Sequence, residues 1–205
     1  MMSKYWCSMT SRRILTTWVF ALILFLLLLF GKIYGDGTTL VEESLFLLGM
    51  CLVAVGIVGR AWSLAYIAGN KNARLVTSGP YSLCRHPLYF SNLLGALGLG
   101  FTTETVTIPL IITCAFALYY TFLITKEEDK LKKRFGSAYA DYRMKVRRFF
   151  PSFRSFHENE YVLIAQKPFR IGVVNLGYFI LLIGVLEFLE VIHKAGLLPT
   201  LFHIY

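Results

Sequence analysis

Cysteine is scarce in this chain of 205 residues, and its four copies form no motif. Cys7, Cys51, Cys84 and Cys114 lie far apart, without a CxxC pair or an even spacing. A disulfide framework and a structural zinc site are therefore not expected, and we predict no metal ligands. Acidic residues are also few, with 12 Asp and Glu against 21 Lys and Arg, which gives a formal net charge of +9.

A dinucleotide-binding loop is missing as well. Gly95, Gly98 and Gly100 lie close together, but their spacing is not GxGxxG and no strand is predicted before them. A tightly packed helix explains these glycines better, because small residues let helices approach closely in a membrane.

Apolar residues, in contrast, are abundant, at 56% of the chain. Soluble domains are less apolar, so we predict an all-α, polytopic membrane protein in which residues 1–205 form a single membrane domain. A bilayer core requires about 20 apolar residues per helix. Five runs are candidates, the third of them short: 14–30, 44–67, 88–101, 106–125 and 171–191.

The basic residues predict the orientation of these five helices. Lys and Arg gather at the N-terminus, in residues 69–87 and in residues 126–170, whereas the opposite connections carry few of them. By the positive-inside rule, the three basic regions face the cytosol. Residues 1–74 then hold two helices, 75–151 a central segment, and 152–205 a linker with the last helix.

An amphipathic helix is predicted over Lys126–Arg148, where the composition changes from apolar to charged. Its apolar and aromatic residues recur at the spacing of one helical face. They are Leu131, Phe135, Tyr139, Tyr142 and Val146. Gly136 is expected to interrupt the helix.

The segment LVTSGPYSLCRHPLYFSN, residues 75–92, has the character of a site. Its Gly-Pro and His-Pro steps break regular helix, because proline lacks the N–H group and biases the preceding residue toward extended geometry. Backbone groups freed at a membrane boundary need water, protein or a ligand. Arg85 and His86 place donors beside them.

This segment, together with the sequence EEDKLKKRFGSAYADYRMKVRRFFP that follows one helical hairpin later, resembles the isoprenylcysteine carboxyl methyltransferases. More broadly, it is similar to the phospholipid-type methyltransferases of membranes. The shared elements are GPY at 79–81, RHPxY at 85–89, the pair Glu127-Glu128, FGxxYxxY at 135–142 and the closing RRFFP. They cover residues 75–151, over a third of the chain.

The resemblance implies S-adenosylmethionine (SAM) as the methyl donor, bound on the cytosolic face, and a lipophilic acceptor from the bilayer. Arg85 and His86 suit the carboxylate of SAM, and either Glu127 or Glu128 suits its ammonium or ribose. The implied cofactor residues are Leu75, Val76, Gly79, Tyr81, Arg85, His86, Tyr89, Asn92, Glu127, Glu128, Tyr142, Phe149 and Pro151. The implied catalytic residues are Arg85, Glu128 and Arg148.

Several questions stay open at this point. Adjacent glutamates point about 100° apart on a helix, so only one of the pair is expected to face the cofactor. An acceptor carboxylate or phosphate would need only a cation, whereas a hydroxyl or ammonium acceptor would need a base. The partners expected are membrane lipids and a lipophilic substrate, not nucleic acid; the oligomeric state is left open.

Two alternative functions remain. Membrane sterol reductases are similar in their C-terminal core but use NADPH. A non-catalytic protein whose basic face binds anionic lipid would also explain Arg85 and His86 as headgroup contacts.

Overall fold

The structure is a computed structural model that describes residues 31–33, 39–70, 73–197 and 202–204. The chain divides into two compact units, residues 35–184 and residues 1–34 with 185–205. The first predicted apolar helix, residues 14–30, lies outside the described residues. In the smaller unit, strand β1 (Gly31–Ile33) pairs in parallel with β2 (Phe202–Ile204), with Gly31 opposite Phe202.

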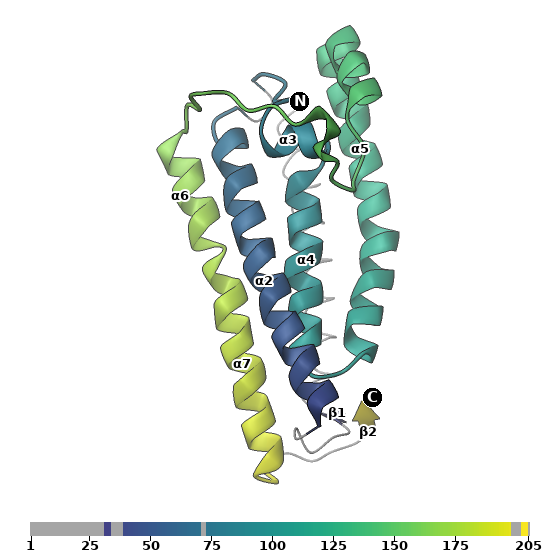
Figure 1. Cartoon of the computed structure of the whole chain (residues 1–205), viewed down its shortest axis with the longest axis vertical. Helices are drawn as coiled ribbons and strands as arrows, with labels where there is room; N and C mark the ends of the chain where they lie inside the picture. Colours follow the sequence, from purple (N-terminus) through teal and green to yellow (C-terminus); the bar gives the residue numbers. More distant parts are fainter. Residues whose placement is uncertain (1–30, 34–38, 71–72, 198–201, 205) are drawn as a thin grey trace, which may run out of the picture. The chain divides into compact units, whose positions relative to one another are not determined.

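The larger unit is helical, which confirms the predicted fold class (Figure 1). Its helices are α2 (Leu40–Ile67), α3 (Pro80–Leu83), α4 (Pro87–Phe101), α5 (Thr107–Lys145), the 3₁₀ helix η1 (Phe153–Ser155) and α6 (Gln166–Val174), followed by α7 (Gly177–Lys194), which continues into the smaller unit. Helix α2 starts with a capping box, in which Thr39 and Glu42 exchange hydrogen bonds.

Within the described part of the chain, three helical stretches are long and apolar enough to cross a membrane: residues 40–67, residues within 107–145, and residues 166–193. Helix α4, at 15 residues, is shorter. In α5 the apolar part precedes Lys126, and the charged part follows it. These helices fit a membrane protein; the count of five stays a prediction.

Glycines set the distance between α2 and α4. A Cβ on Gly98 would lie 2.6 Å from the carbonyl oxygen of Gly49 and 2.6 Å from the amide nitrogen of Val53, and one on Gly56 would lie 2.7 Å from the amide nitrogen of Gly95. The two backbones therefore touch, as small residues allow in membrane helices. Helix α5 packs on the other side of α4 (Figure 1).

Two helices depart from the predicted pattern. The amphipathic helix is not separate, because α5 runs from the apolar run into the charged segment. Gly136 interrupts α5 as predicted, with φ 52° and ψ −122°. The last apolar run is not one helix, since α6 ends at Val174 and α7 begins at Gly177.

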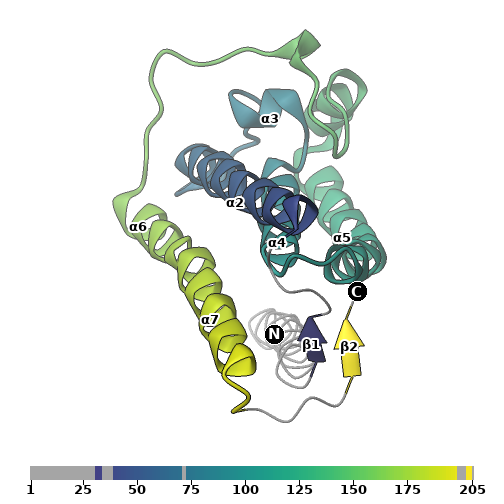
Figure 2. The ribbon, with the colours of Figure 1, turned by 60° about the horizontal axis from the view of Figure 1, so that its bottom comes forward.

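The charged part of α5 anchors itself through its predicted apolar face. Tyr139, Tyr142 and Val146 are buried in one cluster, and Leu75, Leu131 and Phe135 pack against it. Beyond the helix, the chain passes α3 before it reaches α6 (Figure 2).

We expect Gly98→Ala to lower the melting temperature, because the added methyl group collides with backbone atoms of α2 that cannot move aside. Overpacking of this kind costs about 1–3 kcal/mol. Gly184→Ala is the matched control, since a Cβ there meets nothing within 4 Å. Thermal unfolding in detergent micelles measures both; equal losses in the two variants would contradict glycine-mediated packing of α2 on α4.

Candidate functional site

The turn between α3 and α4 is held by the segment that follows α5. The amide of Gly79 donates to the carbonyl of His157 at 2.8 Å, that of Arg85 to Arg147 at 2.8 Å, and that of Ser152 to Leu83 at 2.9 Å. The backbone groups freed by the Gly-Pro and His-Pro steps are thus partly satisfied by protein. These three hydrogen bonds fix the backbone position of Arg85 and of its neighbour His86.

Gly79 has a conformational reason to be glycine. Its φ is +60°, and a Cβ at this position would overlap the ring of Tyr66 from α2. Only glycine adopts such a conformation at no steric cost. The GPY element therefore serves the fold of the turn.

Glu128 of α5 joins three basic side chains. Its Oε1 lies 3.1 Å from Nη2 of Arg85 and 3.3 Å from Nε2 of His86, and its Oε2 lies 3.3 Å from Nε of Arg148. Arg148 also donates to the hydroxyl of Thr125 at 2.7 Å. We call Arg85, His86, Glu128 and Arg148 the cation cluster.

The charges in this cluster keep Glu128 ionised. Burial opposes ionisation, but the hydrogen bond with His86 and the charges of Arg85 and Arg148 outweigh it and lower the pKa of Glu128 below its usual 4.5. Nearby, burial raises the pKa of Tyr139 to about 12, with a further contribution from Glu128, so this phenol is neutral at pH 7.

Arg85 keeps unused donors. Its side chain is 7% exposed, and its Nε and Nη1 are buried without a hydrogen-bond partner among the described residues. The side chain lines a cavity of about 300 Å³. The other lining residues are Thr125, Glu128, Asp129, Lys132, Tyr139, Arg143 and Arg148. Buried guanidinium nitrogens without partners are costly, so this cavity is suited to an anion.

Aromatic side chains lie beside the cation cluster. Tyr89 stacks on His86 with ring centroids 5.7 Å apart, and its hydroxyl donates to Glu127. Phe149 packs edge-on against Phe90 at 5.7 Å and lies 5.8 Å from Phe116. Phe149 of the closing RRFFP motif therefore contacts both α4 and α5.

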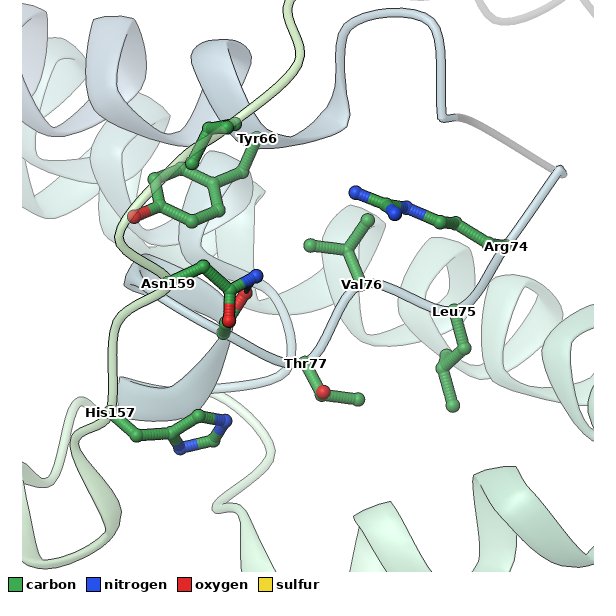
Figure 3. A pocket seen from close by; sticks show the side chains of 9 residues that line it. Tyr66, Arg74, Leu75, Val76, Thr77, His157 and Asn159 are labelled. Carbon is green, nitrogen blue, oxygen red and sulfur yellow. Dashed lines mark hydrogen bonds between the residues drawn. The ribbon is translucent and has the colours of Figure 1, made fainter.

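A second, polar cavity of about 180 Å³ lies beside residues 74–78 (Figure 3). Leu75 and Val76 line it, as do Tyr66, His157 and Asn159. The hydroxyl of Tyr66 donates to Glu158 at 2.5 Å, and the amide of Asn159 donates to the hydroxyl of Ser78 at 3.0 Å. The linker after η1 thus forms one wall of this cavity.

A third cavity, of about 300 Å³, is lined almost entirely by carbon. It lies between α2, α3, α4 and the closing segment, and Trp62, Leu83, Phe90, Leu94 and Pro151 are among its lining residues. Such a surface suits an apolar chain.

The predicted site residues are thus brought together unevenly. Arg85, His86, Glu128 and Arg148 meet directly, and Tyr89 connects them with Glu127. Tyr142 is buried and donates to the carbonyl of Tyr81 at 2.6 Å. Gly79 lies in the turn, while Leu75 and Val76 line the polar cavity. Phe149 and Pro151 lie near Phe90, and Asn92 accepts from Arg60.

Three residues that contact the motifs in the structure were not predicted from the sequence. Arg60 of α2 and the linker residues Glu158 and Asn159 were not predicted to contact the motifs. Arg60 had a signal, as a lone arginine in an apolar run. The linker residues had none, because their contacts to Tyr66 and Ser78 span more than 80 residues of sequence.

A family profile and one group of relatives, both named as methyltransferases, resemble part of the chain. The profile of the phospholipid methyltransferase family matches residues 44–138. The protein-S-isoprenylcysteine O-methyltransferase of Schizosaccharomyces pombe is 32% identical over 102 residues, which cover 48% of this chain and 43% of that protein.

Longer similarity is found to two bacterial proteins. The cobalt-zinc-cadmium resistance protein CzcN of Cupriavidus metallidurans is 41% identical over 171 residues, 83% of this chain and 78% of CzcN. The nickel-cobalt-cadmium resistance protein NccN of Alcaligenes xylosoxydans is 36% identical over 162 residues, 79% of this chain and 76% of NccN. No solved structure matches significantly. The chain therefore belongs to the same family as CzcN and NccN, and a segment of it matches the phospholipid methyltransferase profile.

We expect Glu128→Gln to lower the melting temperature at neutral pH, because Arg85, His86 and Arg148 lose their shared carboxylate; a charge-assisted bond contributes about 1.5–3 kcal/mol. The pKa of Glu128 is lowered in the folded state, so its contribution is present above the ordinary carboxyl pKa and lost as pH falls through the folded value. The difference between wild type and Glu128→Gln should therefore shrink as pH falls below the ordinary carboxyl value of 4.5.

Asp141→Asn is the control for this measurement, since Asp141 is an exposed acidic residue of the same helix. Its melting temperature should follow the wild type at every pH. A Glu128→Gln deficit that does not shrink at any pH below 4.5 at which both proteins remain folded would show that ionised Glu128 is not the cause.

Proposed function

We propose that the chain is a SAM-dependent methyltransferase that acts at the membrane surface on a lipophilic acceptor. The observation that carries this proposal is the buried Arg85, which keeps two nitrogens without partners beside Glu128, His86 and Arg148. The family supports methyl transfer; the cofactor and the acceptor are proposed here.

The cation cluster fits SAM in chemical type. Arg85 and His86 would hold its carboxylate, and Glu127 or Glu128 its ammonium or ribose. Aromatic rings such as Tyr89 and Phe149 would meet the adenine or the cationic centre. When bound, SAM supplies a methyl group on a positively charged sulfur, ready for attack by a nucleophile.

The protein's own task is then to align two reactants and to exclude water. Arg148 closes the cytosolic side of the cluster, with its side chain bonded to Glu128 and Thr125. Phe149 and Phe150 pack on Phe90 behind it. The apolar cavity beside Phe90 and Pro151 would receive the hydrocarbon part of the acceptor.

The proposed site faces the cytosol. The cation cluster and the linker belong to the two basic regions that the positive-inside rule places there. A polar cofactor would enter from that side, while a lipophilic acceptor would arrive from the bilayer.

Two relatives carry names that refer to metal resistance. Within the described part of the chain, no group of three or more His, Cys, Asp or Glu residues is placed to hold a metal ion. The proposal therefore concerns methyl transfer alone.

We expect Arg85→Gln and His86→Ala each to weaken binding of S-adenosylhomocysteine by about ten-fold or more, the usual loss for a charge-assisted hydrogen bond. Isothermal titration calorimetry on the purified protein measures this affinity. Arg154→Gln is the control, because Arg154 is an exposed basic residue on η1. Unchanged affinity in both site variants would mean that the cofactor binds elsewhere.

The same titration separates the alternatives. A reductase would bind NADPH in place of S-adenosylhomocysteine, and a lipid-binding protein would bind neither cofactor.

The double change Phe149→Ala and Phe150→Ala should reduce methyl transfer from radiolabelled SAM into membranes much more than it reduces the melting temperature. Phe149 contacts α4 and α5, so its loss opens the site to water, whereas Phe150 is 69% exposed. The matched control is Tyr161→Ala together with Leu163→Ala, two exposed side chains of the linker that line none of the three cavities. Full turnover in a folded Phe149/Phe150 variant would show that the segment is no lid.

A further inference from the structure

A single arginine lies inside an otherwise apolar part of α2. Apart from Glu42 and Glu43 in the first turn, Arg60 is the one charged residue of this helix. It lies two turns before the helix ends at Ile67, about 10 Å along the helix axis. A charge at this depth in a membrane helix is expensive, and such residues mark pathways or binding sites.

Arg60 is satisfied only in part. Its Nη1 donates to Oδ1 of Asn92 on α4 at 2.7 Å, while its Nε is buried without a hydrogen-bond partner among the described residues. None of the ion pairs in the cation cluster involves Arg60. Among the described residues, the neutral amide of Asn92 is therefore the observed hydrogen-bond partner of the Arg60 guanidinium.

The surroundings of Arg60 connect it with the cation cluster. Its partner Asn92 belongs to α4, as does Tyr89. Tyr120 packs edge-on against Tyr89 at 5.3 Å, and Tyr89 stacks on His86. Asn92 lies one turn below Tyr89 on α4. A column of polar and aromatic side chains thus runs from the cation cluster to membrane depth.

We infer that Arg60 and Asn92 form a binding site for the anionic group of a lipophilic ligand, a carboxylate or a phosphate, that enters from the bilayer. In the proposed function this ligand is the methyl acceptor, and that identification rests on the proposed function. The anion-binding site itself rests on the uncompensated arginine.

The chemistry favours an anion over a neutral ligand. An arginine offers a planar set of donors that matches carboxylate and phosphate in two-point contacts. The Nε–H group is part of that set and is unused. The amide of Asn92 holds the guanidinium without neutralising it, as a binding site for an anion requires.

A purely structural role makes a different prediction. If Arg60 only links α2 to α4, a carboxylate at position 92 would serve as well as the amide, because it strengthens the same contact. If Arg60 binds an anion, Asn92→Asp neutralises it and removes the site while the contact to α4 remains.

The test measures binding of two anionic amphiphiles and their uncharged matches to the purified full-length protein in detergent micelles, by microscale thermophoresis. N-acetyl-S-farnesylcysteine is compared with its carboxamide, and dioleoyl phosphatidic acid with dioleoylglycerol. The two pairs distinguish a carboxylate from a phosphate ligand.

We expect wild type to prefer at least one anion over its neutral match by about ten-fold or more. Arg60→Gln and Asn92→Asp should lose this preference, and Arg60→Lys should retain part of it. Asn92→Asp should keep the wild-type melting temperature. Glu43→Gln, which removes an exposed charge from the other end of α2, is the control and should keep the preference.

The inference is overturned if wild type shows no preference in either pair, or if Asn92→Asp retains it. It is also overturned if Asn92→Asp weakens S-adenosylhomocysteine binding as much as His86→Ala does, since Asn92 would then serve the cofactor. A wild type that binds no S-adenosylhomocysteine but prefers the anion contradicts the proposed function and leaves the Arg60 site standing.

Discussion

Glu128 is the charge on which the arrangement of the site depends. Two separate parts of the chain supply the basic side chains that meet it: the turn before α4, with Arg85 and His86, and the segment after α5, with Arg148. Without its carboxylate, the guanidinium groups of Arg85 and Arg148 would face each other in a half-buried space, where like charges repel strongly. One carboxylate orients the three but does not balance them, so the cluster stays suited to a further anion.

The glycine contacts between α2 and α4 determine what α2 contributes. Because Gly98 touches the backbone near Gly49 and Val53, the helices lie close enough for Arg60 to reach Asn92. In lipid, the hydrophobic effect does not drive apolar helices together. Van der Waals contacts at the glycines and hydrogen bonds between the helices therefore stabilise the packing of α2 on α4. Packing and polar chemistry are therefore linked at the same pair of helices.

The sequence predicts features that depend on short-range chemistry and leaves open those that depend on helix rotation. The apolar runs, the break at Gly136 and the basic turn at Arg85 follow from composition and backbone preference. Which glutamate meets the cations does not, because adjacent residues differ by about 100° and only packing fixes the rotation; the structure pairs Glu128 with Arg85 and Glu127 with Tyr89. The break between α6 and α7 was not predicted, because no proline in the sequence marks its position.

The division of charge along the column also bears on the proposed cofactor, whose carboxylate is anionic and whose sulfur is cationic. The cation cluster attracts the first and repels the second, so the two groups cannot occupy the same place. Phe149 follows Arg148 of the cluster in sequence and packs with Phe90 and Phe116, and such rings attract cations without adding a charge. An anion held by Arg60 would add a negative charge at the far end of the column. A cationic centre is therefore most favourably placed among the aromatic rings, between the cation cluster and an anion bound at Arg60.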